Sequence, residues 1–350
     1  MNAAALLSEL RRRDIHVWAA GGELRCSAPP GALTPELREQ LRRHKREILA
    51  FVASAQALAG QQPAIVPLQP KGSRAPVFAV PGHNGDVFCY RVLAQALGEE
   101  QPFFGLQPPG LDGRGDPLKR VEDIAAYFVA QVHAFRPQGP YVIAGFCAGG
   151  TIAFELAQQL LAGGAAVSFV ALFGSPYPSY FRRRTQWWQC LRDQAGRFGK
   201  LASELGSLSH RDLRRYCDEK LARHRARRDA ARAAALDPVL APRVRVQRAT
   251  VSAVRRYEPR HFAGRVCLFL AGRQWQRSSV AARRWLSVAL QGEEYCGPDG
   301  SEGFDMLRER HAPQFAELFR RCRDSGETNP LAGCGDLGCG PLRVKEMLPY

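Results

Sequence analysis

Residues 141–150 read YVIAGFCAGG and determine which fold this 350-residue chain is expected to adopt. Tyr141–Ala144 is a short apolar run typical of a buried strand, and a helical pattern begins at Gly149. Between them, the small residues Gly145 and Gly149 let the chain turn sharply around Cys147. A nucleophile at such a strand–turn–helix junction is called a nucleophile elbow. Cys147 is therefore the candidate nucleophile, and a buried structural cysteine in a glycine-rich turn is the alternative.

Strands and helices alternate on both sides of this elbow. Strands are predicted at 77–80, 103–106, 166–173 and 265–270, and helices at 90–97, 121–135, 149–163 and 312–322. Such alternation forces a mostly parallel sheet that helices cover on both faces, which is an α/β fold. Residues 179–256 interrupt the alternation with an arginine-rich, aromatic and helical stretch that fits a helical lid.

The two ends of the chain differ from this α/β pattern. Residues 1–55 predict a small α-β-β-α unit, with a helix at 3–13, strands at 16–19 and 23–28, and helices from Thr34, the expected N-cap, to 53. The remaining boundaries are a linker rich in Ala, Gln and Pro at 56–73, the α/β domain at 74–323, and a disordered tail at 324–350.

Composition argues against several classes of protein. The net charge is +16, but only six of the 49 basic residues are Lys and Arg occurs in every segment, so nucleic-acid binding is not predicted. Acidic carrier proteins would be attracted by the same charge. The first fifteen residues lack the apolar core of a signal peptide and no run reaches about 18 apolar residues, so we expect a soluble, cytoplasmic protein without a membrane partner.

The ten cysteines are expected to be reduced thiols, as is usual in the cytosol. Cys334 and Cys339 have no companion pair at the spacing of a metal site, so neither a metal nor another bound cofactor is predicted.

Several motifs occur in a fixed order along residues 74–322. They are VPGHNG (80–85), QPFFGLQ (101–107), GLDG (110–113), RPQGPY (136–141), GFCAGG (145–150), YEP (257–259), FAGRV (262–266) and FDMLRE (304–309). Together they resemble the thioesterase domains of non-ribosomal peptide and polyketide synthetases. The resemblance implies an α/β-hydrolase fold with a helical lid. It also implies an oxyanion hole made by the backbone N–H of Ala148 and one from the loop around His83.

The N-terminal unit has its own resemblance. LRCSAPPGAL (24–33) and the pair His44-Lys45 are similar to the small N-terminal docking domains of assembly-line proteins, the type first seen in tubulysin synthesis. The resemblance implies that residues 1–55 bind the C-terminal segment of an upstream synthetase by strand addition. An unrelated helical cap is the alternative.

The sequence departs from the thioesterase pattern at all three catalytic positions. Cys147 stands where the family usually has Ser, Gly174 stands at the place of the Asp, and Gly303 at the place of the His. His311 is the candidate replacement base, although it matches a second histidine that the family often has on its final helix. An amine substrate could be oriented by one of three nearby carboxylates, Asp299, Glu302 and Asp305.

These departures favour transfer of an acyl group over hydrolysis. A thiol whose pKa is lowered at a helix N-terminus is partly ionised without a base, whereas activation of water requires one. We therefore expect Cys147 to take an acyl, aminoacyl or peptidyl group from the phosphopantetheine thioester of a carrier protein and pass it to a thiol or an amine. The alternatives are a hydrolytic or cyclising thioesterase that uses His311, and an inactive docking scaffold. The acyl substrate, the acceptor and the oligomeric state stay open.

Overall fold

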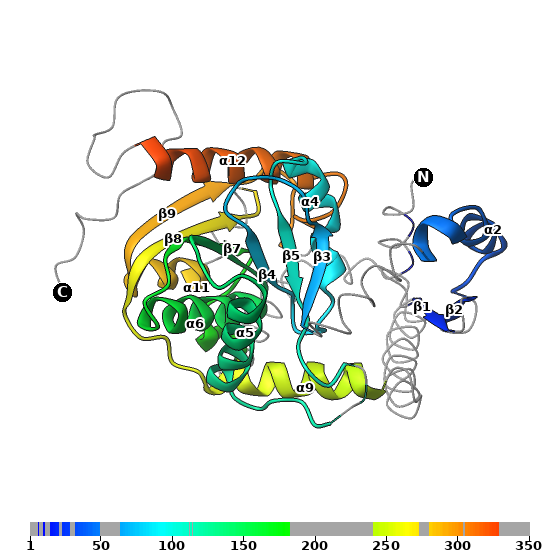
Figure 1. Cartoon of the computed structure of the whole chain (residues 1–350), viewed down its shortest axis with the longest axis horizontal. Helices are drawn as coiled ribbons and strands as arrows, with labels where there is room; N and C mark the ends of the chain where they lie inside the picture. Colours follow the sequence, from blue (N-terminus) through cyan, green and yellow to red (C-terminus); the bar gives the residue numbers. More distant parts are fainter. Residues whose placement is uncertain are drawn as a thin grey trace, which may run out of the picture.

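The computed structural model describes residues 6, 10, 15–20, 23–28, 32–49, 64–111, 113, 115–182, 241–272, 280–303 and 305–328. In this part of the chain a two-stranded sheet lies near the N-terminus and a seven-stranded sheet forms the centre of the main body (Figure 1). Residues 183–240 of the predicted lid and 329–350 of the predicted tail lie outside the described residues.

The N-terminal unit is built around one antiparallel hairpin. β1 (His16–Ala20) pairs with β2 (Glu23–Ser27), and α2 (Pro35–Arg43) follows, with a further helical stretch at 45–49. The N-cap prediction is confirmed, because the Thr34 side chain accepts a hydrogen bond from the backbone N–H of Leu37 at 3.4 Å. The core of this unit consists of Leu6, Leu10, Ile15, Leu37, Leu41 and Ile48.

The seven-stranded sheet has the order β3-β5-β4-β6-β7-β8-β9. Its strands are β3 (Ile65–Gln69), β4 (Val77–Val80), β5 (Phe103–Leu106), β6 (Tyr141–Phe146), β7 (Val167–Phe173), β8 (Phe262–Leu270) and β9 (Ala289–Cys296). β3 runs antiparallel to β5, and all other neighbours are parallel. The carboxyl ends of the parallel strands therefore meet at one edge of the sheet, where ligand sites of α/β folds lie.

Helices cover both faces of this sheet, as the alternation predicts (Figure 1). One face carries α5 (Val121–Phe135), α6 (Gly149–Ala162) and α9 (Ala241–Arg256), and the other carries α4 (Arg91–Leu97) and α12 (Ala312–Thr328). Successive strand residues alternate between the two cores: Phe78 and Ile143 belong to the first, and Ala79 and Ala144 to the second. Both faces are buried, so the strands are continuous apolar runs.

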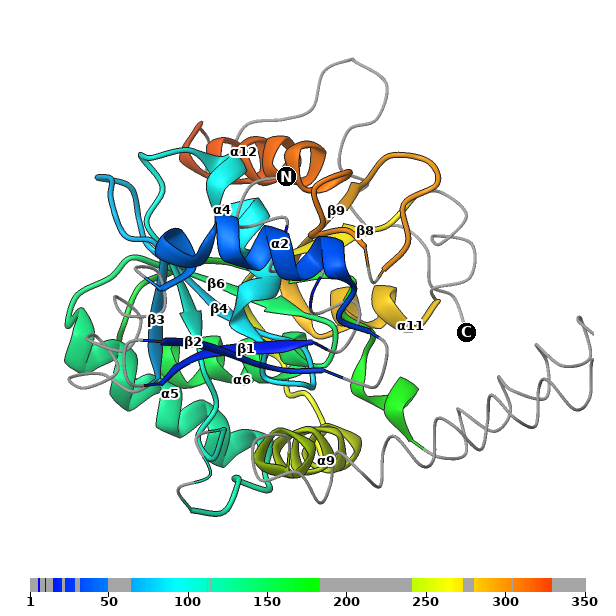
Figure 2. The ribbon, with the colours of Figure 1, turned by 90° about the vertical axis from the view of Figure 1, so that its right-hand side faces the viewer.

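Four short helices complete the described part of the chain. They are η1 (Val87–Tyr90), η2 (Pro178–Phe181), α11 (Val280–Arg283) and η3 (Arg284–Ser287). The described ends of the predicted lid, η2 and α9, lie against each other, and Arg255 Nε donates a hydrogen bond to the carbonyl of Phe181 at 2.8 Å. Figure 2 views the molecule from the side of the N-terminal unit, with α9 below the sheet.

The predicted linker is wrong where β3 forms, because residues 65–69 are an edge strand of the sheet. Pro67 favours a linker in the sequence, but an edge strand tolerates proline because one side of it makes no ladder hydrogen bonds. The Gln69 side chain holds the end of this strand, since its Nε2 donates to the carbonyls of Glu99 and Gln101 at 2.8 and 3.0 Å.

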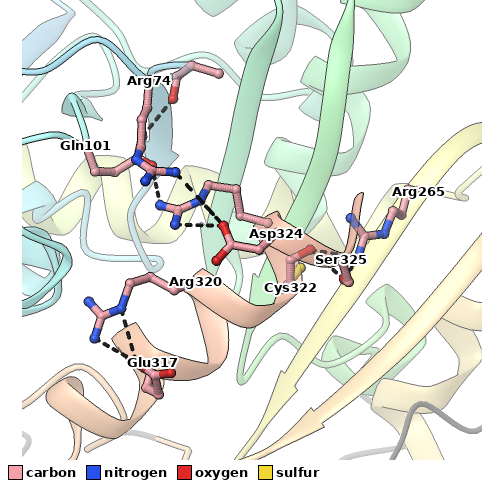
Figure 3. A network of polar contacts seen from close by, with 10 residues as sticks. Arg74, Gln101, Arg265, Glu317, Arg320, Cys322, Asp324 and Ser325 are labelled. Carbon is pink, nitrogen blue, oxygen red and sulfur yellow. Dashed lines mark hydrogen bonds and ion pairs between the residues drawn. The ribbon is translucent and has the colours of Figure 1, made fainter. Parts of the chain in front are cut away.

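The predicted disordered tail is wrong for residues 324–328, which continue α12. Figure 3 shows the polar contacts that hold this last turn. Arg265 on β8 donates to the carbonyl of Cys322 and to Ser325 Oγ, both at 2.8 Å, and Arg323 pairs with Asp324 at 2.8 Å. The two contacts from Arg265, which lies in another part of the chain, offset the helix-breaking effect of Gly326.

Candidate active site around Cys147

Cys147 occupies the sharp turn between β6 and α6. Its φ is +53°, and it is the one non-glycine residue with positive φ in the described part of the chain. Its backbone N–H donates to the carbonyl of Phe173, at the end of the neighbouring strand β7, at 3.1 Å. A side chain persists in this region only where its surroundings force it there, and such residues cluster at functional sites.

Glycines make the elbow sterically possible. A Cβ on Gly145 would lie 2.5 Å from the Cα of Gly150, and one on Gly149 would lie 2.0 Å from the carbonyl oxygen of Pro81. Real Cβ atoms do not approach other atoms so closely, so the backbone needs glycine at both places. The turn predicted from the spacing of these glycines is confirmed.

The Cys147 thiol is half-buried, and this burial raises its pKa above the ordinary value, while the backbone N–H of Ala148 acts in the opposite direction. The prediction of a lowered pKa is therefore wrong. The reason is that desolvation penalises the thiolate more than one N–H group stabilises it. At neutral pH the resting group is the protonated thiol.

The predicted oxyanion elements lie beside the elbow. Ala148 is the buried N-cap residue of α6. The loop after β4 contains Gly82, and a Cβ on Gly82 would lie 3.5 Å from the ring of Phe146, the residue before Cys147. His83 follows in this loop, and burial lowers the pKa of its imidazole, which is therefore neutral at pH 7.

Tyr90 is a part of this region that sequence reasoning missed. It is fully buried at the end of η1, and its hydroxyl donates to the carbonyl of Val80 at 2.8 Å. Burial raises the pKa of Tyr90 well above its ordinary value, and the thiols of Cys89 and Cys147 act in the same direction. Tyr90 fixes the end of β4, from which the His83 loop departs.

The two positions expected to hold the other triad residues lie next to each other. Gly174 directly follows β7 with φ +49°, and its N–H donates to the carbonyl of Phe269 at 3.0 Å. A Cβ on Gly174 would lie 3.1 Å from the carbonyl oxygen of Gly303 and 3.5 Å from its Cα. The resemblance of motifs thus pointed to two positions that the fold brings together, and neither carries a side chain that could accept a proton.

His311 is buried at the start of α12, with 4% of its surface exposed. Neither ring nitrogen has a hydrogen-bond partner, so the structure does not join this imidazole to Cys147. Its Nε2 lies 3.7 Å from Asp305 Oδ2, and Asp305 Oδ1 accepts from the backbone N–H of Glu302 at 2.8 Å. Of the three carboxylates expected near this loop, Asp305 is the one that pairs with the imidazole.

The described residues contain no cluster of three or more side chains that could hold a metal ion, and Cys334 and Cys339 lie outside these residues. No helix among them combines the length and the apolar character that a membrane span requires.

The sequence also matches known protein families and proteins. Residues 75–321 match the family model of the thioesterase domain, and residues 4–53 match that of the TubC N-terminal docking domain. Both resemblances deduced from the motifs are therefore confirmed.

Curated relatives include two large synthases. Indigoidine synthase of Dickeya dadantii (strain 3937) is 39% identical over 114 residues, which cover 32% of this chain and 8% of that protein. Polyketide synthase PksR of Bacillus subtilis (strain 168) is 35% identical over 117 residues, covering 33% of this chain and 4% of that protein. The chain thus matches only a small part of each relative.

Solved structures have the same fold. The NocB thioesterase domain from the nocardicin cluster superposes with a TM-score of 0.53 at 20% identity, covering 74% of this chain and 98% of that one. The Vlm2 thioesterase domain gives 0.52 at 21% identity, with the same coverage of both chains. At this identity the likeness establishes the α/β-hydrolase fold. Because the family model covers more than half of its residues, this chain belongs to the thioesterase-domain family, and a TubC-type docking domain precedes that domain.

Proposed function

We propose that this protein transfers acyl, aminoacyl or peptidyl groups in non-ribosomal peptide or polyketide biosynthesis, with Cys147 as the covalent nucleophile. The donor is the phosphopantetheine thioester of a carrier protein, and the acceptor is a second thiol or an amine. One observation carries this proposal: a strained cysteine sits at the elbow, while both positions expected for its triad partners are glycines that lie side by side.

The loading step exchanges one thioester for another. Cys147 Sγ forms a bond to the acyl carbon, the bond from that carbon to the phosphopantetheine sulfur breaks, and the proton lost by Cys147 ends on the departing thiol. One thioester and one thiol are consumed, and one thioester and one thiol are formed. The free-energy change of the step is therefore small. In this proposal the N–H of Ala148, the N-cap residue of α6, donates to the oxyanion that forms between these two states.

The second step depends on the acceptor. A thiol reverses the same exchange, and a neutral amine attacks without a base because its lone pair is free. The amine then gives up one proton to the departing Cys147 sulfur, so the thiol is restored. Water would need a general base for the same attack, and neither Gly174 nor Gly303 supplies one.

Hydrolysis or cyclisation through His311 is the second candidate function. It is favoured by the pairing of His311 with Asp305, which is how a catalytic imidazole is usually oriented. In this reading the turn that carries Gly303 would have to move so that the imidazole reaches Cys147. An inactive scaffold that binds carrier proteins is the third candidate.

The partners follow from the domain organisation that we propose. Residues 1–55 dock, residues 179–256 or thereabouts form a lid, and the domain that contains Cys147 carries out the chemistry. The hairpin of β1 and β2 would bind an upstream synthetase by strand addition, and the main domain would receive its carrier protein. We place the reaction in the cytoplasm, where Cys147 and the other free cysteines stay reduced. No cofactor of the chain itself is needed, because phosphopantetheine arrives on the carrier.

Product analysis tests this function. Acyl-loaded carrier is mixed with the protein, first alone and then with an amine or a second carrier thiol, and the products are separated by mass. The proposal expects the acyl group on the added acceptor and little free acid. Free acid as the main product would favour hydrolysis, and an untouched donor would favour the scaffold.

A further inference from the structure

Ser175 follows β7 and contacts the backbone next to the elbow, and only 2% of its surface is exposed. Its Oγ lies 3.2 Å from the carbonyl oxygen of Gly145 and 3.1 Å from that of Phe173, so its single hydroxyl proton is shared between them. Gly145 precedes Cys147 by two residues, and the Phe173 carbonyl accepts from the N–H of Cys147. Ser175 therefore ties together the two strand ends that hold the nucleophile.

Ser175 packs closely against the first turn of α6. A Cβ on Gly150, in the first turn of α6, would lie 2.2 Å from Ser175 Oγ. The hydroxyl thus fills the space between the end of β7 and the start of the helix that follows Cys147. A displacement of Ser175 would free both ends of the strained turn.

Trp285 in turn holds Ser175. It is fully buried in η3, and its Nε1 donates to the carbonyl of Ser175 at 3.0 Å. The centre of its ring lies 4.8 Å from that of Phe154 on α6 and 5.0 Å from that of Tyr177. The indole, which lies 110 residues after Ser175 in the sequence, therefore joins the segment after β7 to the helix after Cys147.

We propose that Ser175 and Trp285 are positioning residues that hold Cys147 in its left-handed conformation, with Sγ directed at the N–H of Ala148. Cys147 has positive φ, and a non-glycine residue keeps such a conformation only where several contacts impose it. The shared hydroxyl proton of Ser175 and the indole N–H of Trp285 are two of these contacts. The inference rests on the proposed role of Cys147 as the nucleophile, but it predicts the reactivity of the thiol itself.

The test is the pH dependence of Cys147 alkylation by iodoacetamide in the full chain, followed by mass spectrometry of the peptide that contains Cys147. Ser175→Ala is expected to move the midpoint of the profile upwards by about one pH unit, because the thiolate loses its aligned donor. Acyl loading at neutral pH is expected to fall about tenfold with it. Trp285→Phe keeps the ring and removes only the N–H, so a smaller shift in the same direction is expected.

Neighbouring groups do not produce such a shift. Burial and the two nearby thiols raise the pKa of Tyr90 well above its ordinary value, so this phenol stays neutral over the pH range in which the Cys147 thiol ionises. Burial lowers the pKa of His83, which is neutral over the same range. The profile therefore reports the Cys147 thiol.

Ser301→Ala is the matched control. Ser301 is 5% exposed, and its Oγ donates to the carbonyl of Pro298 at 2.7 Å and accepts from the N–H of Gly272 at 3.0 Å, so this variant also removes a buried hydroxyl that is bonded to the backbone. It is expected to lower the melting temperature about as much as Ser175→Ala and to leave the alkylation profile unchanged.

Two outcomes would overturn the inference: wild-type profiles for both Ser175→Ala and Trp285→Phe, or an equal shift for Ser301→Ala. If Ser175→Ala does not fold, Trp285→Phe decides the question. A shifted profile in a protein that never accepts an acyl group would retain the positioning role and reject the proposed function.

Discussion

Gly174 and Gly303 face each other at the carboxyl edge of the sheet, where a Cβ on Gly174 would lie 3.1 Å from the carbonyl oxygen of Gly303 and 3.0 Å from the sulfur of Met306. Backbone and a buried methionine thus occupy the place where a carboxylate and an imidazole are expected. Neither of these two positions therefore offers Cys147 a proton acceptor.

This closed contact predicts that Gly174→Asp destabilises the protein. A carboxylate there combines the strain of φ +49° with the crowding at Met306, so we expect a loss of about 2–4 kcal/mol in the free energy of unfolding. Gly164→Asp is the control, since Gly164 has φ +81° and nothing within 4 Å of its Cβ position. The difference between the two variants in the free energy of unfolding, measured with urea, gives the cost of the crowding. Equal losses would mean that the structure has room for a side chain at Gly174.

The fold could largely be predicted from local patterns. β4 and β5 form at the predicted residues because buried parallel strands are short apolar runs. β9 was missed because its sequence, ALQGEEYC, is polar and its residues are only partly buried. Its place in the sheet is set by pairing with β8 and by the bidentate contact of Arg265 with Glu293. No local pattern encodes such a partner.

The site could be predicted only in part. Glycine spacing identified the elbow at Cys147, because backbone turns depend on neighbouring residues. The direction of the pKa shift was missed, because burial depends on segments that are distant in sequence. Ser175 and Trp285 were missed for the same reason, since 110 residues separate them.

Loading of Cys147 is predicted to accelerate with pH beyond the neutral range. Burial raises the pKa of the thiol above its ordinary 9.0, so the thiolate fraction grows about tenfold per pH unit below that pKa and levels off only above 9. The measurement is the initial rate with a small thioester surrogate between pH 6.5 and about 9.5. A plateau below pH 8 would instead indicate a thiol activated by an imidazole.

His311→Ala is predicted to leave loading within about threefold of the wild type, because neither ring nitrogen is hydrogen-bonded to any group of the site. The fold should lose about 1–3 kcal/mol of stability, since a buried side chain and its pairing with Asp305 disappear. Asp305→Asn removes the charge of the partner while retaining its size, and serves as the comparison. If His311→Ala were as damaging as removal of the Cys147 thiol, the hydrolytic function would gain support.

Removal of the N-terminal unit is predicted to change partner choice and not chemistry. The truncated chain should start at Ala64, because β3 begins at Ile65 and belongs to the main sheet. Docking raises the effective concentration of a tethered donor to about millimolar, so loading from the native upstream carrier should weaken while a small surrogate is unaffected. Circular dichroism checks folding. Equal losses with both donors, or no loss with either, would contradict the docking role of residues 1–55.

The central claim is that Cys147 itself carries the acyl group, and intact-protein mass spectrometry after incubation with an acyl-loaded carrier tests it most directly. We predict a mass increase of one acyl group in the wild type, located on Cys147 by peptide mapping. The increase should be absent in Cys147→Ala, and in Cys147→Ser it should be slower by at least about a thousandfold, since a hydroxyl without a base hardly ionises. An acyl adduct that persists in Cys147→Ala, or an equally fast adduct on the serine variant, would contradict the account.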